Sequence, residues 1–151
     1  MKQFKFFILC LSLLVVSGLQ AQMPQGRTDA TIIADALAQL PAETPKKFNQ
    51  VIADLVTTGE QGMLDLIGRM NPPGDKSNEA LDFAIGGWTD FVANDNAKRA
   101  VAAGAFEKAL GQPLDKEVKA FVIRQLRKIG TDGNVDVLSG FLADNHLSGD
   151  A

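Results

Sequence analysis

The sequence predicts an all-α protein, a short α-solenoid of antiparallel helix pairs. Apolar residues recur at spacings of three and four through most of the chain, which places them on one face of a helix. Pro, Gly, Asn and Asp gather in short breaks between these stretches, and no stretch after the N-terminal leader alternates apolar and polar residues as a strand does. Because short helices that each bury one stripe must pack in pairs, we expect about three pairs and one additional N-terminal helix.

The first 21 residues have the three-part pattern of a secretory signal peptide. Lys2 and Lys5 precede an apolar run from Phe6 to Val16, and a small, polar stretch ends at Ala21. The run has 11 residues. As a helix it would extend about 16 Å, roughly half the hydrocarbon thickness of a bilayer. We therefore expect cleavage near Ala21, a periplasmic or extracellular location, and no membrane span in the mature chain.

Composition excludes several classes of function. The chain has 15 Lys and Arg against 18 Asp and Glu, a net charge of −3, which becomes −5 once the two lysines of the leader are removed. An acidic chain has no broad basic surface for nucleic-acid phosphates, so we expect no nucleic-acid partner. One His, and no Cys after loss of Cys10, cannot supply a zinc site, disulfides or a cysteine nucleophile. We expect no cofactor, no metal and no enzymatic activity.

We interpret residues 22–27 as a flexible linker and residues 28–151 as one helical repeat domain. Thr28 or Asp29 is expected to cap the first helix, which Pro41 stops. A second helix starts at Thr44-Pro45, where Pro fits the first helical position, and runs to Gly59. The third is short and stops at Asn71-Pro72-Pro73-Gly74.

Four more helices follow. Ser77 is expected to cap the fourth, which stops before Asn94-Asp95-Asn96, and the fifth runs to Gly111. The sixth has the clearest apolar stripe, and Gly130 is expected to end it with a positive φ angle. The apolar residues expected to form the seventh helix and to cover the sixth are Val135, Leu138, Phe141 and Leu142.

The aromatic residues are expected to supply the large core side chains, namely Phe48, Phe83, Trp88, Phe91, Phe106, Phe121 and Phe141. Gly86 and Gly87 beside Trp88 favour a close helix approach with the indole in the core. The alternative is an aromatic platform for a sugar ring.

An internal repeat supports the solenoid. Residues 52–62 align with residues 123–133 at an offset of 71 residues, with Ile, Leu, Gly and Gly coinciding. Leu126-Arg127-Lys128-Ile129-Gly130, followed by Val135-Asp136-Val137-Leu138, resembles the HEAT-like repeats of the phycobilin-lyase type. The first unit departs at Thr58, and the unit between the two departs more. The resemblance implies a scaffold or protein-binding role without catalytic residues.

The resemblance also implies an alternative. Similar repeat domains precede carbohydrate-active domains in exported bacterial proteins, so the chain could be the N-terminal module of a longer exported enzyme. Residues 144–151 look like the opening of another repeat. Either the repeat domain is incomplete at its C-terminus, or its last apolar face is a docking surface through which the chain self-associates.

One cluster is a candidate binding site for a protein or glycan partner. A basic ridge opposite the apolar stripe of the sixth helix is the local reversal of charge on this acidic protein, and it consists of Lys116, Lys119, Arg124, Arg127 and Lys128. An ordinary solvated helix face is the competing interpretation. Two candidates are weaker. His146 beside Asp144 could act as a general base, and the competing interpretation is a solvated histidine. Residues 132–136 could form a calcium loop, and the competing interpretation is a turn.

Overall fold

A computed structural model describes residues 26–151, and this part of the chain is all-helical, as predicted. The signal-peptide prediction and residues 22–25 of the predicted linker lie outside the described residues. The elements are α1 (Asp29–Leu37), α2 (Pro45–Val56), α3 (Gly59–Gly68), α4 (Glu79–Val92), α5 (Asn96–Leu110), α6 (Lys116–Ile129), a 3-10 turn η1 (Asp132–Asn134) and α7 (Val135–Ser139). Across these residues, no helix combines the length and apolarity that a membrane crossing needs.

Helix starts follow local capping chemistry. The Thr28 hydroxyl accepts a hydrogen bond from the Thr31 N–H, and Thr44 caps α2 with Pro45 at its first position. Helix α4 begins at Glu79, after Asn78, and the Ser77 hydroxyl accepts a hydrogen bond from the Glu79 N–H at 3.2 Å, so Ser77 contributes to the cap as predicted. The Asn78 side chain bonds instead to the backbone of Asn71, at 2.9 and 2.8 Å, which closes the loop between α3 and α4.

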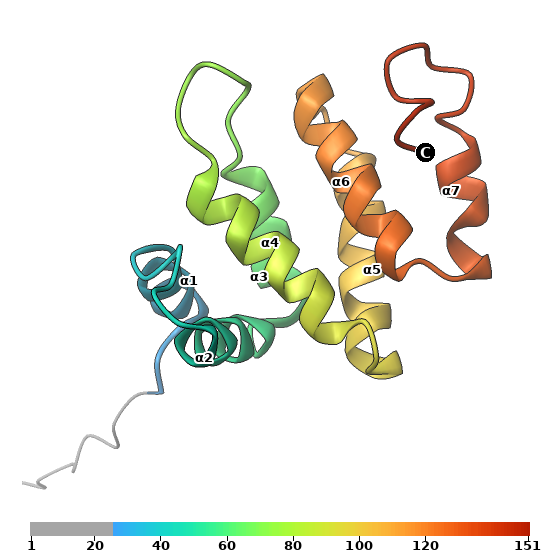
Figure 1. Cartoon of the computed structure of the whole chain (residues 1–151). Helices are drawn as coiled ribbons and strands as arrows, with labels where there is room; N and C mark the ends of the chain where they lie inside the picture. The colour runs from blue at the N-terminus through green and yellow to red at the C-terminus, as the bar shows by residue number, and fades with distance from the viewer. Residues whose placement is uncertain (1–25) are drawn as a thin grey trace, which may run out of the picture.

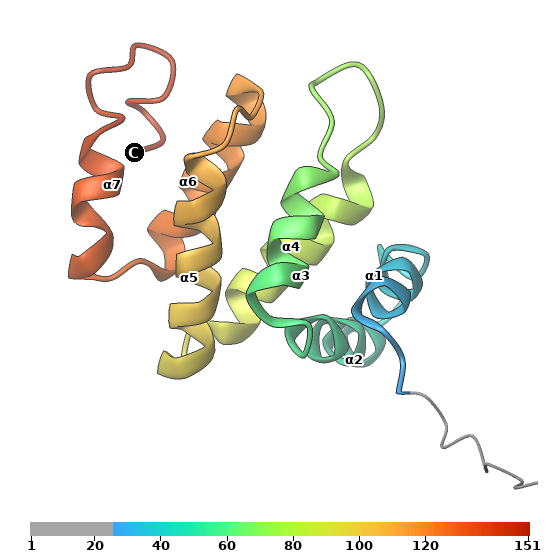
Figure 2. The same ribbon diagram turned by 180° about the vertical axis from the view of Figure 1, so that it is seen from behind.

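Helices α4 and α6 form one row and α3 and α5 the other (Figures 1 and 2). Within the rows α4 contacts α6 and α3 packs against α5, while α2 lies across the end of α3 and α4 and contacts both. Helix α1 closes the N-terminal end by contacting α2, α3 and α4. Arg27, predicted to lie in the linker, already belongs to the fold, because its guanidinium lies 2.9 Å from both Asp35 and Asp54.

The core lies between the rows and contains two of the predicted aromatic side chains, Trp88 and Phe106. Phe83 and Phe91 are each 43% exposed, so their predicted burial is wrong. Helix α4 buries the stripe of Leu81, Ala84, Ile85, Trp88 and Val92, and the two phenylalanines lie outside it. Phe48, Phe121 and Phe141 are half-buried against the core.

Gly59 and Gly130 occupy equivalent positions of the internal repeat but have different backbone conformations. Gly59, with φ of 63°, joins α2 directly to α3. Gly130 was expected to share this geometry, but its φ is −59° and its ψ is 159°. Glycine is required at this position for steric reasons, because a Cβ atom there would lie only 2.8 Å from the Leu126 carbonyl oxygen.

Gly87 provides the predicted close helix approach. A Cβ atom there would lie 2.5 Å from Phe48 Cζ and 2.8 Å from Ile52 Cδ1, both on α2. Trp88 is 1% exposed, so it fills the core and offers no platform for a sugar ring.

The C-terminal region differs most from the prediction. Helix α7 has five residues and none of them is buried, while Val135 and Leu142 are 56% and 59% exposed. Leu138 and Phe141 are half-buried. The chain turns back after α7 and places Leu147, 4% exposed, in the core. The predicted burial of Val135 is therefore wrong, and Leu147 is the buried apolar residue of this region.

Candidate binding surface on helix α6

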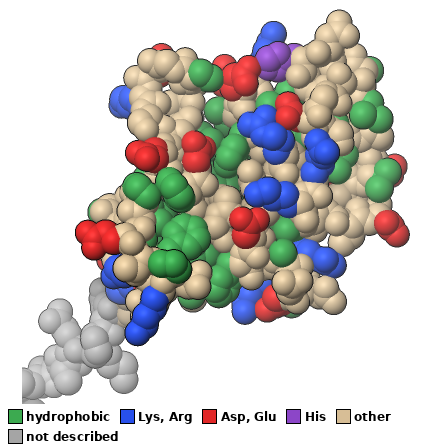
Figure 3. Space-filling view, viewed as in Figure 1, with side chains coloured by type: hydrophobic (Ala, Val, Ile, Leu, Met, Phe, Trp, Pro, Cys, Tyr) green, Lys and Arg blue, Asp and Glu red, His purple; other side chains and the backbone are tan. Residues whose placement is uncertain are grey.

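The predicted basic residues lie on the surface of α6 and define the α6 ridge: Lys116, Lys119, Arg124, Arg127 and Lys128. Lys119 is half-buried and the others are exposed. Lys and Arg side chains gather over α6 in the space-filling view (Figure 3). The opposite side of the helix is buried and carries Leu126 and Ile129.

Three members of the ridge contact other parts of the chain. Arg124 Nη1 lies 3.0 Å from Asp150 Oδ1. Arg127 Nη1 donates to the Asp150 carbonyl at 3.0 Å and lies 3.5 Å from that of Gly149. Lys128 Nζ is 3.4 Å from Asp90 Oδ1 on α4. The two arginines thus hold the segment that follows α7, which the sequence did not predict.

The 144–151 segment has further attachments. The Asp144 carboxylate accepts hydrogen bonds from the backbone N–H groups of His146 and Leu147, which lower the pKa of this aspartate. His146 Nε2 lies 2.8 Å from Glu117 Oε1 on α6, and both side chains are about half exposed. This pairing supports an anchoring role for His146.

A small hollow of about 160 Å³ adjoins the ridge between α4, the loop before it and α6. Arg124, Asp82 and Phe121 are among its lining residues. Burial raises the pKa of Asp82, and the positive charge of Arg124 opposes this shift. Asp82 is therefore a carboxylate whose charge the fold disfavours.

Asp82→Asn is expected to raise the unfolding temperature at pH 7 and to leave it nearly unchanged at pH 3. A raised pKa in the folded state means that ionisation of Asp82 removes stability as the pH rises, and the amide cannot ionise. Asp144→Asn is the control of opposite sign, because its pKa is lowered in the folded state and its charge stabilises that state at pH 7. Thermal unfolding at both pH values measures the two effects. A fall in the unfolding temperature of Asp82→Asn at pH 7 would contradict the expectation.

A larger hollow of about 330 Å³ lies on α4 beside the ridge, lined by Phe48, Asp82, Phe83, Gly86, Gly87 and Asp90. At Gly86 the hollow has open space, because a Cβ atom placed there would have no heavy atom within 4 Å. The rings of Phe48 and Phe83 meet edge to face, with centroids 6.4 Å apart. Apolar side chains on the α2 and α4 part of the molecule share one face with the basic side chains of α6 (Figure 3). This face combines an apolar hollow with a cationic ridge.

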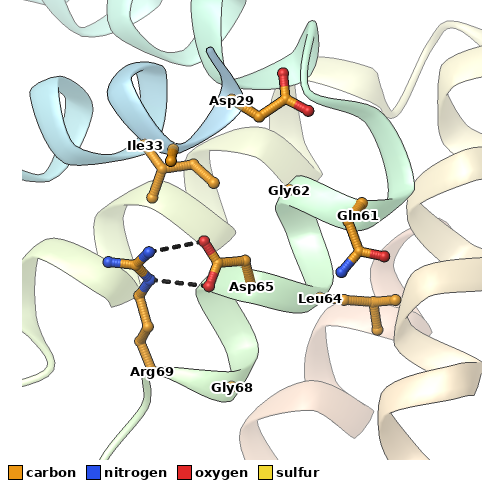
Figure 4. A pocket seen from close by; sticks show the side chains of 9 residues that line it. Asp29, Ile33, Gln61, Gly62, Leu64, Asp65, Gly68 and Arg69 are labelled. Carbon is orange, nitrogen blue, oxygen red and sulfur yellow. Dashed lines mark hydrogen bonds and ion pairs between the residues drawn. The ribbon is translucent and has the colours of Figure 1, made fainter.

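Two further hollows flank α3. One, of about 390 Å³, lies between α1 and α3, where Asp65 and Arg69 point toward one another at 2.8 Å beside Asp29 and Gln61 (Figure 4). Hydrogen bonding to Asp65 raises the pKa of Arg69. The other, about 570 Å³, is more apolar and is lined by Leu64, Ile67, Gly68, Lys108, Ala109, Gln112, Pro113 and Leu114. Both form between helices, so no sequence motif indicated them.

The predicted turn at residues 132–136 is confirmed, because η1 lies there. The Asn134 side chain is buried, accepts a hydrogen bond from the Thr131 N–H at 2.7 Å and donates to Glu107 on α5. Among residues 26–151, no three His, Cys, Asp or Glu side chains are grouped to hold a metal ion.

Comparison of the chain with protein-family models, curated proteins and solved structures gives no match. The resemblance to HEAT-like repeats therefore rests on the sequence patterns around Leu126–Gly130 and Val135–Leu138.

Proposed function

We propose that this chain is an exported, non-catalytic helical-repeat scaffold that binds an acidic segment of a protein partner on the face formed by α4 and α6. The observation that carries the proposal is the α6 ridge itself. On a protein of net negative charge, it places exposed cations beside an open apolar hollow. Charge complementarity of this kind selects and orients acidic partners.

The order of helix contacts supports a repeat scaffold. Helix α2 contacts α4 and α4 contacts α6, while α3 packs against α5, so every second helix along the chain is in contact. Ile52 and Ile123 are both fully buried, as are Leu55 and Leu126, which are the equivalent positions of the two repeat units. Stacked helix pairs present extended surfaces on which partners dock. The leader sequence supports export of such a scaffold.

The contacts of the ridge favour a protein over a glycan. Arg127 donates to backbone carbonyl oxygens, which any peptide offers. The neighbouring hollow is lined by Phe48 and Phe83, which suit an apolar side chain.

A fluorescently labelled Asp/Glu-rich peptide without aliphatic residues tests the proposal by anisotropy titration. We expect binding that weakens with added salt, and an affinity about tenfold lower when Lys116, Lys119 and Lys128 are all replaced by Gln, because three weak charge contacts are lost. The arginines stay in place, so the 144–151 segment keeps its contacts.

The matched control replaces three lysines away from α6, Lys46, Lys47 and Lys76, by Gln. Both triple variants lose three positive charges, so they have the same net charge and differ only in where the charges are lost. The control variant should therefore bind the peptide within twofold of the unsubstituted chain. Equal affinities for both triple variants would contradict the proposal, and so would binding of a sulfated glycan such as heparin without binding of the peptide.

A further inference from the structure

The 144–151 segment is seated on the α6 ridge as a ligand would be. It offers a carboxylate to Arg124, from Asp150, and backbone carbonyl oxygens to Arg127. Leu147 enters the core three residues before the aspartate. One aliphatic anchor and one acid are therefore recognised together.

The local backbone of the segment sets this spacing. The N–H of Ser148 donates to the Asp144 carbonyl at 2.9 Å, and the N–H groups of Asp150 and Ala151 donate to the Leu147 carbonyl at 2.9 and 3.1 Å. These are bonds of a helical turn, in which residues three apart lie on the same side. The turn therefore places Leu147, which enters the core, and Asp150, which reaches Arg124, on one side.

Apart from Leu147, the segment is held by polar contacts, which are the Arg124–Asp150 and His146–Glu117 pairs and the hydrogen bonds from Arg127. The Arg124 and Asp150 side chains are 46% and 25% exposed, and exposed ion pairs contribute little to stability. Helix α7, which connects the segment to the rest of the fold, has no buried residue. Segments with few buried contacts open at low cost in free energy.

We propose that the α6 ridge recognises partner segments with an aliphatic residue three positions before an aspartate, and that the 144–151 segment is an internal copy that such a segment displaces. The inference rests on the proposed function and specifies the chemistry and regulation of one part of that face, the part of the α6 ridge around Arg124 and Arg127. The partner's aliphatic side chain takes the place of Leu147, and its carboxylate takes the place of Asp150 at Arg124.

Displacement predicts how affinity responds to the internal copy. The apparent dissociation constant is the intrinsic one divided by the fraction of molecules with a free site. If the segment occupies the site in about nine of ten molecules, weakening it raises the apparent affinity, by about tenfold at most when the segment is released completely. Loss of Arg124 removes the gain, because the arginine serves both ligands.

The test uses the full chain and a labelled synthetic peptide with the sequence of residues 144–151, blocked at both ends. Asp150→Asn is expected to bind the peptide about threefold more tightly than the unsubstituted chain, because the lost ion pair weakens the segment without releasing it completely. Asp150→Asn combined with Arg124→Gln is expected to lose this gain. Asp136→Asn, which removes the same charge from α7, is the matched control and should leave the affinity unchanged. A peptide with Ser and Asn in place of its Leu and second Asp should not bind.

Hydrogen exchange gives a second measurement on the unsubstituted chain. Saturating peptide should speed amide exchange at residues 147–151 several-fold, because their hydrogen bonds open when the segment leaves, and should leave exchange in α3 unchanged. Unchanged exchange at residues 147–151 would overturn displacement even if the peptide binds.

The two proposals fail differently. Asp150→Asn binding the peptide no more tightly than the unsubstituted chain would overturn this inference, as would equal binding of the substituted peptide. If the Asp/Glu-rich peptide still binds through the lysines in that case, the proposed function stands. Failure of both peptides to bind overturns both.

Discussion

Leu126→Ala is expected to lower the free energy of unfolding by about 2–5 kcal/mol. Leu126 is fully buried on α6, a helix that contacts both α4 and α5. Truncation removes apolar contacts and leaves a cavity that the two packed helices cannot close. Urea unfolding followed by circular dichroism measures the loss.

Leu142→Ala is the matched control, because Leu142 is 59% exposed. The same truncation there should change stability by less than about 0.5 kcal/mol. A loss below about 0.5 kcal/mol for Leu126→Ala would mean that α6 buries a different face.

Gly87→Leu is expected to lower stability by about 1–3 kcal/mol, although leucine is the better helix former. The Cβ position already lies 2.5 Å from Phe48 Cζ, and Ile52 behind it is fully buried. The larger side chain must therefore force α2 and α4 apart. Chemical unfolding measures the loss, and a red shift of the emission of Trp88, which is 1% exposed on α4, would report that separation of the helices lets water reach the indole.

The neighbouring position separates packing from helix propensity. No heavy atom outside the helix backbone lies within 4 Å of a Cβ placed at Gly86. Gly86→Ala is therefore expected to gain about 0.5–1 kcal/mol, because alanine loses less backbone entropy than glycine on folding. Opposite signs at adjacent positions of one helix are the expected result. A gain at both would show that α2 yields and that Gly87 is not a packing constraint.

The α6 ridge contains residues with two different roles, and this decides which substitutions can test partner binding. Arg124 and Arg127 are the ridge members that hold the chain's own segment, whereas Lys116 and Lys119 have no such role in the proposal. Replacing the arginines alone would change binding and anchoring together. Substitutions at the lysines and at Asp150 separate these two effects.

The sequence alone determined the all-helical class and most helix limits. Thr44 was identified as a cap, and Thr28 as one of two alternatives with Asp29, because a capping hydroxyl bonds to a backbone N–H only three residues away. The stripe containing Leu126 was predictable because one helix's periodicity shows which of its sides is apolar. The basic residues of α6 were found for the same reason, as the polar side of that helix.

Tertiary structure decided the features that depend on segments distant in sequence. Phe83 and Phe106 are equally apolar, yet Phe83 is 43% exposed and Phe106 is fully buried, because neighbouring helices cover one and not the other. The φ angle of Gly130 follows from where the chain must go after α6, and the hollows arise between helices. Arg124 and Asp150 are 26 residues apart, and no local pattern encodes their meeting. Helix periodicity and capping act within a few residues, whereas burial and charge pairing depend on which surfaces the fold brings together.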